Sequence, residues 1–388
     1  MTIPARPIAP ALPNERATYQ GARAAAVRVE EYFRRYHAAG LPGAGPVAPE
    51  PDAQSIETMI DAAFWASLRR EEGYVAKISL AFAAPHHTGA PLLFERPLAL
   101  EAAALARVAP AVERPGIHLG VWPRDGRLMV WGTIRSVPMY CFVLEVAAPG
   151  LLVIKHHRGG DGGKFANVAV LEGDTLKVID EHATSLPDCP PLVHSLLGFS
   201  PAAPGQPSMN VLVQLAVSMR AHGRGGALLI VPAASDTWRE SMVKPISYAV
   251  ASFSELRALM TETPDDRRVW QDEVEHAVEA IAGLTAVDGA TVLTERFELL
   301  AFGAKIGRRD GCPRVELVTV TEPIEGSAAQ SLNPSELGGT RHLSAAQFVH
   351  DQHDAVALVA SQDGHFTVFA WSPCENMVHA HRVEALLL

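Results

Sequence analysis

The chain has 388 residues, more than a single hydrophobic core ordinarily organises, so we expect two domains. Hydrophobic residues make up 48% of it and charged residues 20%, a balance that excludes a disordered chain. The formal net charge of -10 gives no overall attraction to nucleic acid or to an anionic membrane, so neither is an expected partner.

The cysteines and the N-terminal residues indicate the cellular compartment of the protein. The four cysteines are far apart and form no CxxC pair, which argues against a zinc ribbon and against a disulfide framework. No apolar run reaches the ~18 residues that a membrane span requires. The first residues, "MTIPARPIAPALPNER", lack the apolar core of a signal peptide. We therefore expect a cytoplasmic protein with a loose tail over residues 1–15.

Residues 16–190 have the pattern of an α+β domain. Helical periodicity covers residues 19–40 and 55–73, and the second helix is expected to be capped at Ser55. Short segments rich in β-formers follow, separated by Gly, Pro or Asp-Gly turns. They lie at residues 76–83, 116–122, 127–134, 139–147, 150–158, 164–173 and 175–181.

A second domain is expected over residues 208–388, after a Pro-rich linker at 191–207. Here helical and strand patterns alternate, which predicts a mixed β-sheet flanked by helices. The clearest helix begins near Asp265 and Asp266 and ends at Gly283. The expected fold class is therefore a two-domain α+β or α/β protein.

Three short motifs in this second half combine polar groups with turns. "VDGATVL" starts at Val287, "GGTRH" at Gly338 and "ASQDG" at Ala360. Each has an ordinary interpretation, since Asp-Gly is a common turn and a loop arginine commonly forms a surface ion pair. The functional interpretation is a ligand site, because backbone N–H groups at a helix start favour anions and an arginine can bind phosphate with two hydrogen bonds.

The order of the three motifs resembles the diadenylate cyclase (DAC) domain, whose pattern is DGA, then GTRHR, then SEE. The resemblance covers roughly residues 205–388. The N-terminal half resembles the DACNV type of sensor domain that precedes such cyclases. That likeness is carried by "ERPGIHLGVW", "GTIRSVPMYCFVLEVAAPGLLVIKHHR" and "GKFANVAVLEGD".

The resemblance implies an enzyme that condenses two ATP molecules into cyclic di-AMP or a related cyclic dinucleotide, under control of the N-terminal domain. It implies a divalent metal, Mg²⁺ or Mn²⁺, and a homodimer or higher oligomer, because two nucleotide-bearing subunits must meet face to face. It also assigns roles by position. Asp288 would be the catalytic, metal-binding carboxylate; Gly289 and Ala290 would line the nucleotide; Thr340, Arg341 and His342 would hold phosphate, the last two also in catalysis; Ser361 would contact the nucleotide and Asp363 the metal.

Two positions depart from the family pattern. Leu343 stands where the family has a third basic residue, and Gln362 replaces one of two acidic residues. These departures favour an alternative function, a nucleotide-binding sensor of the same fold without turnover. A structural partner protein that retains only the remnant of a pocket is the third hypothesis.

Two further features are weaker candidates. "KHHRGGDGGKF", starting at Lys155, is basic and Gly-rich but fails the P-loop pattern, so we interpret it as a hairpin loop, with anion binding as the alternative. The histidine pairs His86-His87, His156-His157 and His379/His381 have no acidic or cysteine partner at metal-ligand spacing. We interpret these histidines as solvated.

Overall fold

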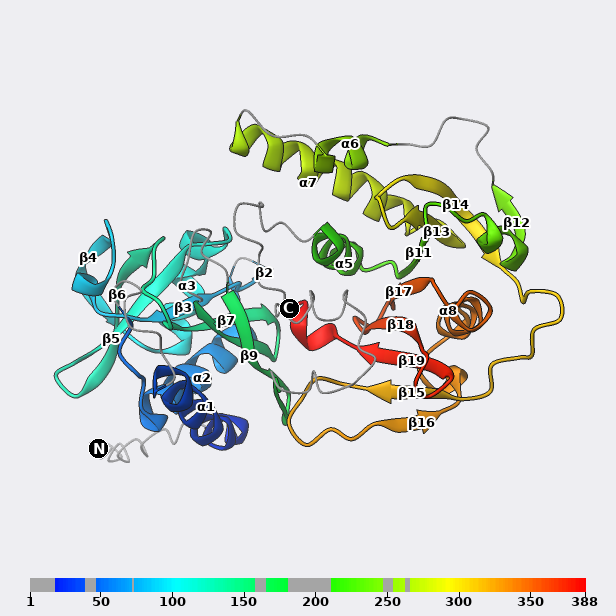
Figure 1. The fold of residues 1–388 in the computed structure, drawn as a ribbon. Helices are drawn as coiled ribbons and strands as arrows, with labels where there is room; N and C mark the ends of the chain where they lie inside the picture. The colour runs from blue at the N-terminus through cyan, green and yellow to red at the C-terminus, as the bar shows by residue number, and fades with distance from the viewer. Residues whose placement is uncertain are drawn as a thin grey trace, which may run out of the picture. The chain divides into compact units, whose positions relative to one another are not determined.

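The computed structural model describes residues 18–38, 47–71, 73–157, 165–180, 211–246, 254–261 and 266–388. The chain divides into two compact units, Met1–Leu176 and Lys177–Leu388 (Figure 1), and the expected two-domain α+β class is confirmed. The expected tail and the expected linker at 191–207 lie outside the described residues. Within the described residues, no helix combines the length and the apolar character needed to cross a membrane.

The first unit is built on an eight-stranded sheet with the strand order β10-β9-β8-β7-β3-β5-β6-β4. Its strands are β3 Ser79–Phe82, β4 Leu92–Ala99, β5 His118–Arg124, β6 Arg127–Ile134, β7 Phe142–Ala148, β8 Leu151–His157, β9 Phe165–Glu172 and β10 Thr175–Val178, besides a small pair β1 Arg70–Glu71 and β2 Tyr74–Val75. Its helices are α1 Gln20–Ala38, α2 Ala53–Ser67 and α3 Ala102–Val108. The strands predicted from residue 76 onward are therefore present, whereas β4 was not predicted.

Local chemistry explains where α2 begins. Asp52 is the N-cap, and its carboxylate accepts a hydrogen bond of 2.7 Å from the backbone N–H of Ser55. The predicted cap at Ser55 is therefore wrong by three residues. Ser55 is itself buried inside the first turn, so its side chain could not take the exposed capping position.

The second unit is built on a nine-stranded sheet with the strand order β12-β14-β13-β11-β17-β18-β19-β15-β16. All neighbours are antiparallel except β11 with β13 and β15 with β19. The strands are β11 Gly226–Val231, β12 Met242–Ile246, β13 Ala290–Thr294, β14 Leu299–Ile306, β15 Val318–Thr321, β16 Gln330–Leu332, β17 Val356–Ala360, β18 Phe366–Ser372 and β19 Met377–Arg382. The helices are α5 Val211–Ala221, α6 Glu255–Thr261, α7 Arg267–Leu284 and α8 Thr340–Asp351.

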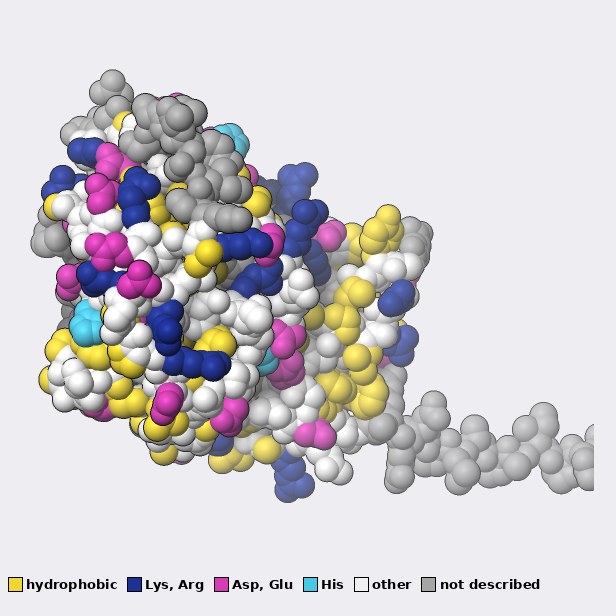
Figure 2. All heavy atoms as spheres, turned by 90° about the vertical axis from the view of Figure 1, so that its right-hand side faces the viewer, with side chains coloured by type: hydrophobic (Ala, Val, Ile, Leu, Met, Phe, Trp, Pro, Cys, Tyr) yellow, Lys and Arg dark blue, Asp and Glu magenta, His cyan; other side chains and the backbone are white. Residues whose placement is uncertain are grey.

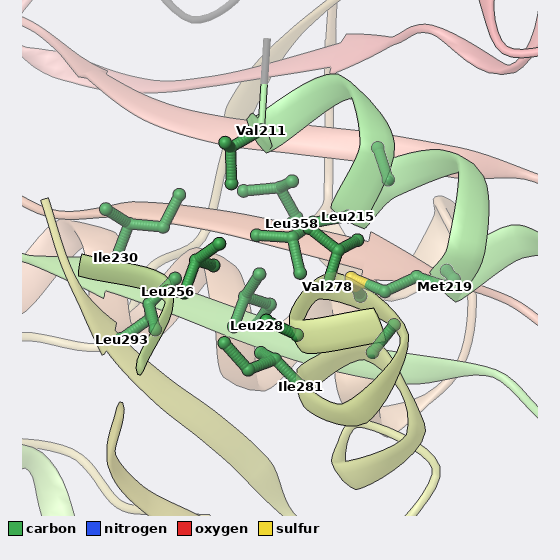
Figure 3. Close-up of a cluster of buried hydrophobic side chains, with 14 of the residues drawn as sticks. Val211, Leu215, Met219, Leu228, Ile230, Leu256, Val278, Ile281, Leu293 and Leu358 are labelled. Carbon is green, nitrogen blue, oxygen red and sulfur yellow. The ribbon is translucent and has the colours of Figure 1, made fainter. Parts of the chain in front are cut away.

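Helices cover both faces of this sheet, as the pattern of β11 requires. Leu228 and Ile230 point into one core, formed with α5, α6 and α7 (Figure 3). Leu229 and Val231 belong to the opposite core, formed with α8. A strand buried on both faces is a continuous apolar run, and burying each such side chain contributes roughly 1.5–3 kcal/mol.

Helix α7 brings the chain to the start of β13. Asp266 caps it by accepting a hydrogen bond of 2.8 Å from Arg268 N–H. Trp270 is buried in the same core and donates its indole N–H to the Leu259 carbonyl at 2.8 Å. The helix ends at Leu284, one residue beyond the predicted Gly283, and the chain then turns through Asp288 into the sheet.

The histidines of two strands are buried, so the prediction of solvated side chains is wrong for His156, His379 and His381. The sequence "MVHAHR" alternates polar and apolar residues as an exposed strand would, yet β19 lies between β18 and β15. His381 is 2% exposed and shares a hydrogen bond of 2.8 Å with Thr321 Oγ1. Burial lowers the pKa of His381 to about 3, so its ring is neutral.

Charged side chains of both signs are interspersed over the face of the molecule that Figure 2 shows. Lys and Arg lie next to Asp and Glu there, with hydrophobic side chains between them. Charge on this face is thus mixed rather than segregated by sign. A charged ligand could therefore be bound here only by a few neighbouring side chains and not by a broad patch of one sign.

Candidate anion-binding site at one end of the nine-stranded sheet

Strand register brings the predicted motifs to the same end of the second unit's sheet. Ala290, the first residue of β13, pairs with Ala227 near the start of β11. Ala360, the last residue of β17, pairs with Gly226 on the other side of β11. Asp288, which precedes β13, and Ser361, which follows β17, therefore lie at the same end of the sheet. They are two strand spacings apart, which corresponds to about 10 Å between backbones.

The third motif reaches this end through α8. The helix begins at Thr340, so Arg341 lies in its first turn. A methyl group built on Gly225 would lie 2.9 Å from Arg341 Nη1, 3.2 Å from the Ala360 carbonyl oxygen and 3.3 Å from Gln362 Cγ. The guanidinium of Arg341 is thus packed against the strand ends that carry the other motifs.

Arg341 has no protein partner in the part of the chain that the structure describes. Its side chain is half-buried, and none of the hydrogen bonds or ion pairs found there involves its guanidinium. A permanently charged group that is partly removed from water is normally paired. Arg341 is therefore the group of this site best suited to hold an external anion.

The start of α8 adds backbone donors. Gly339 is the N-cap and offers no side chain to accept hydrogen bonds from the first turn, and Thr340 is exposed. The first N–H groups of a helix have no partners inside the helix, and the helix dipole favours negative charge beside them. An anion at this point would meet N–H groups and the Arg341 guanidinium together.

His342 is buried, whereas a phosphate ligand is expected to face solvent. It is 2% exposed, its ring lies edge-on to Phe369 with centroids 6.1 Å apart, and its buried Nε2 has no hydrogen-bond partner among the described residues. Burial lowers the pKa of His342, while nearby Asp363 acts in the opposite direction. The ring is therefore a neutral donor or acceptor and not a cation at neutral pH.

Ser361 and Asp363 form a compact turn between β17 and β18. The Ser361 hydroxyl donates to the Asp363 carboxylate, and Ser361 Oγ accepts from the backbone N–H of His365 at 3.1 Å. The hydrogen bond from Ser361 holds the pKa of Asp363 below its ordinary value. Asp363 is exposed, so the turn presents a fixed, ionised carboxylate to solvent.

The segment from Asp288 to Ala290 is shaped by the protein itself. Asp288 is exposed, whereas Ala290 is 1% exposed and packs into the core on the α8 side. Gly289 has φ +111°, and a methyl group on it would lie 2.5 Å from the backbone carbon of Gly303. The glycine is thus required by the close approach of β14, a reason that the turn motif alone did not reveal.

The candidate site offers few ligands for a divalent metal. Among the described residues, no three His, Cys, Asp or Glu side chains are grouped closely enough to hold a metal ion. Asp288 and Asp363 are both exposed and lie at the same sheet end. Mg²⁺ is commonly bound by one or two carboxylates together with the phosphates of a substrate, so these residues fit a metal that arrives with a nucleotide.

The sequence-based site omitted Arg224, which lies in the loop that leads into β11. The Gln362 side-chain amide donates to the Arg224 carbonyl oxygen at 3.3 Å, and Arg224 itself is exposed. Its neighbours Gly223 and Gly225 have φ values of +63° and +69°. The signal in the sequence was an arginine between glycines just before a buried strand, which indicates a tight turn carrying a cation.

A separate pocket of about 430 Å³ lies at the opposite end of the same sheet. It is lined from the end of β11, the loop after β14 and the end of α8, by residues that include Trp238, Arg309, Cys312, Asp351 and His353. The Asp351 carboxylate accepts from Arg309 N–H at 2.8 Å and from the Gln347 amide at 2.8 Å. None of the predicted site residues lines this pocket.

The candidate loop of the first unit is only partly described. Lys155 forms an ion pair of 2.6 Å with Glu145 on the neighbouring strand, so its charge is already matched within the protein. Residues 158–164, which hold the rest of the Gly-rich segment, lie outside the described residues.

Comparison with known proteins gives one finding for the first unit. Residues 45–135 match the family model described as a probable sensor domain, DACNV. No curated protein matches the chain. The matched segment runs from just before α2 to the end of β6 and does not reach residues 208–388, where the comparisons give no evidence for the expected diadenylate cyclase domain. The first unit therefore contains a segment similar to the probable sensor domain DACNV.

Proposed function

We propose that the second unit is a nucleotidyl cyclase of the diadenylate cyclase type, regulated by the first unit. It would bind ATP with Mg²⁺ or Mn²⁺ at the sheet end formed by Asp288, Arg341 and Asp363. The observation that carries the proposal is the half-buried Arg341, which has no partner among the described residues and lies at an uncapped helix start, at the same sheet end as two exposed carboxylates.

The reaction consists of two equivalent phosphoryl transfers between ATP molecules on facing subunits. In each, a 3′-oxygen forms a bond to the α-phosphorus of the other ATP, and the bond from that phosphorus to the pyrophosphate leaving group breaks. The hydroxyl proton passes to solvent or to a base, and two pyrophosphates accompany one cyclic dinucleotide. A homodimer, at least a transient one, follows from this scheme.

The protein contributes positioning and charge. Arg341 and the first N–H groups of α8 would hold phosphate oxygens, and Thr340 would add a hydroxyl. His342 would act as a neutral N–H donor, because burial lowers its pKa. Gly289, Ala290 and Ser361 would shape the nucleotide side of the site, with Ala290 acting through its backbone because its side chain is buried.

Asp288 and Asp363 would hold the divalent metal between them and the phosphates. When bound, the metal supplies charge neutralisation of the phosphate oxygens during transfer. Asp363 suits this role because the Ser361 hydrogen bond keeps it ionised. Asp288 has no hydrogen bond or ion pair within the described residues that would compete for its oxygens.

The first unit supports the regulatory half of the proposal. Its match to a probable sensor domain covers residues 45–135, and domains of this type often occur together with diadenylate cyclase domains. We propose that a signal received by this unit controls how two second units meet.

A nucleotide-binding sensor without turnover is the second candidate. Leu343 packs against the core on the α8 side, so α8 supplies one cation where the family pattern has two. The Gln362 amide donates a hydrogen bond to the Arg224 carbonyl oxygen, and Asp363 is the one carboxylate in the turn from Ser361 to Gly364. These two positions favour binding over catalysis.

Mass spectrometry after incubation with ATP and Mg²⁺ or Mn²⁺ separates the candidates. The cyclase predicts a cyclic dinucleotide that is absent with Asp288→Asn and present with Asp310→Asn, a matched exposed aspartate in the loop after β14. A nucleotide-dependent rise in melting temperature without product would favour the sensor. If ATP gives no cyclic dinucleotide and also does not raise the melting temperature, both candidate functions are overturned.

A further inference from the structure

We propose that Arg224 is a second phosphate-binding cation of this site, supplied by the loop before β11 in place of the basic residue absent at Leu343. The inference rests on the proposed function and deepens it, since it assigns a contact to the polyphosphate chain of the nucleotide.

The loop lies between the predicted motifs. On one side, Gly226 is packed so closely against the end of α7 that a methyl group on it would lie 2.6 Å from the Thr285 carbonyl oxygen. Thr285 begins the turn that leads to Asp288. On the other side, Gly225 contacts Arg341 and the strand end at Ala360. Arg224 therefore stands at the centre of the sheet end where Asp288, Arg341 and Asp363 meet.

Hydrogen bonds hold the backbone of Arg224, whereas its guanidinium forms no ion pair with a carboxylate within the described residues. Its N–H donates to His222 Nδ1 at 3.1 Å and its carbonyl accepts from the Gln362 amide. Positive φ at both flanking glycines gives the loop a conformation that other residues rarely adopt. The side chain is exposed, and within the described residues no carboxylate pairs with it. A rigid backbone with an unengaged cation is suited to a ligand contact.

Charge matching gives the ligand chemistry. The uncapped start of α8 and Arg341 together favour an anion, and two exposed carboxylates nearby favour a metal-bound anion over a bare one. A metal-bound triphosphate presents several oxygens, spread over more than one phosphorus, and a single guanidinium covers one pair of them. Arg224 would hold a different phosphate from Arg341, because the two arginines reach the site from different elements.

Binding measurements on the full chain test the assignment. We compare the dissociation constants of Mg²⁺-ATP and AMP for the wild type, Arg224→Ala and Arg224→Lys, with Arg341→Ala as the reference for a lost phosphate contact. Arg296→Ala is the matched control, since Arg296 is exposed just beyond the opposite end of β13. We expect Arg224→Ala to weaken ATP binding about tenfold and AMP binding about twofold, Arg224→Lys to lie between, and Arg296→Ala to match the wild type.

The outcomes separate the two proposals. If the wild type binds no ATP at all, the proposed function is overturned, and this inference with it. If the wild type binds ATP and Arg341→Ala weakens that binding, but Arg224→Ala matches Arg296→Ala, the proposed function stands and the role of Arg224 is overturned. Equal losses for ATP and AMP would also overturn the assignment to the polyphosphate chain. Thermal unfolding of each variant confirms that it is folded.

Discussion

Gly225 and Arg341 are in contact across the end of the sheet: a methyl group on the glycine would lie 2.9 Å from the arginine Nη1. The two residues are more than a hundred positions apart in sequence, and their contact places the guanidinium at the strand ends. The glycine is thus part of the candidate anion-binding site, because any side chain there would displace the guanidinium.

This contact predicts a difference between two neighbouring glycines. Gly223→Ala and Gly225→Ala both introduce a side chain at positive φ, which costs about 1–2 kcal/mol. A methyl group on Gly223 meets nothing within 4 Å, whereas one on Gly225 crowds Arg341 and the Ala360 carbonyl oxygen. We expect both variants to lose free energy of unfolding, Gly225→Ala more than Gly223→Ala because of this crowding, and weaker binding of Mg²⁺-ATP only for Gly225→Ala. Urea unfolding and calorimetric titration measure the two effects, and equal affinities in the two variants would contradict the proposed geometry.

Gly289 is expected to be far less tolerant than a helical glycine. Gly289→Ala combines φ +111° with a methyl group 2.5 Å from the Gly303 backbone, so β13 and β14 would have to move apart. We expect a loss of more than about 2 kcal/mol in the free energy of unfolding. Gly283→Ala is the matched control, because Gly283 lies in the last turn of α7 with open space around it, and there the substitution should stabilise by up to about 1 kcal/mol. A mild effect at Gly289 in urea unfolding would rule out the close approach of the strands.

The buried His381 predicts a loss of stability in mild acid. Its pKa is lowered to about 3 in the folded state, below the ordinary value of 6.5. Above pH 6.5 the ring is neutral in both states, so it contributes no pH dependence. As the pH falls from 6.5 toward 3, the unfolded state binds a proton that the folded state refuses, and stability falls by up to about 1.4 kcal/mol per pH unit.

The measurement is the slope of unfolding free energy against pH between 7.5 and 5, in the wild type and in His381→Gln. Other buried histidines, such as His118 and His342, also have lowered pKa values and contribute to the wild-type slope. The difference between the two proteins isolates His381. We expect the variant to have a shallower slope whatever its absolute stability, and parallel slopes would show that His381 does not titrate as described.

How much of this could be predicted from the sequence depends on whether a signal was local. Helix α7 was predicted to within a residue or two, because Asp266 and the periodic face containing Trp270 are local signals. Strand β19 was missed, because its two histidines imitate an exposed face and their burial depends on neighbours distant in the chain. The edge strand β4 was missed for a related reason, since it has no buried residue to give it a pattern.

The residues of the candidate site show the same difference between local signals and contacts distant in the chain. The motif residues were found because each motif joins a turn signal to a reactive side chain. Their convergence depends on the register of β11, which pairs with β13 in parallel and with β17 in antiparallel fashion. The sequence of one strand does not specify its neighbours or their direction. For the same reason the burial of His342 and the position of Arg224 emerged only with the sheet.

Helix α8 runs from the candidate anion-binding end of the sheet to the pocket at the other end. Thr340 begins it at the first site, and His350 and Asp351 close it at the second, about 17 Å away along the axis. A hydrogen-bonded helix transmits an axial push with little compression. The two ends of the sheet are therefore connected by one continuous helix, and any axial shift of its first turn would also displace the residues that line the far pocket.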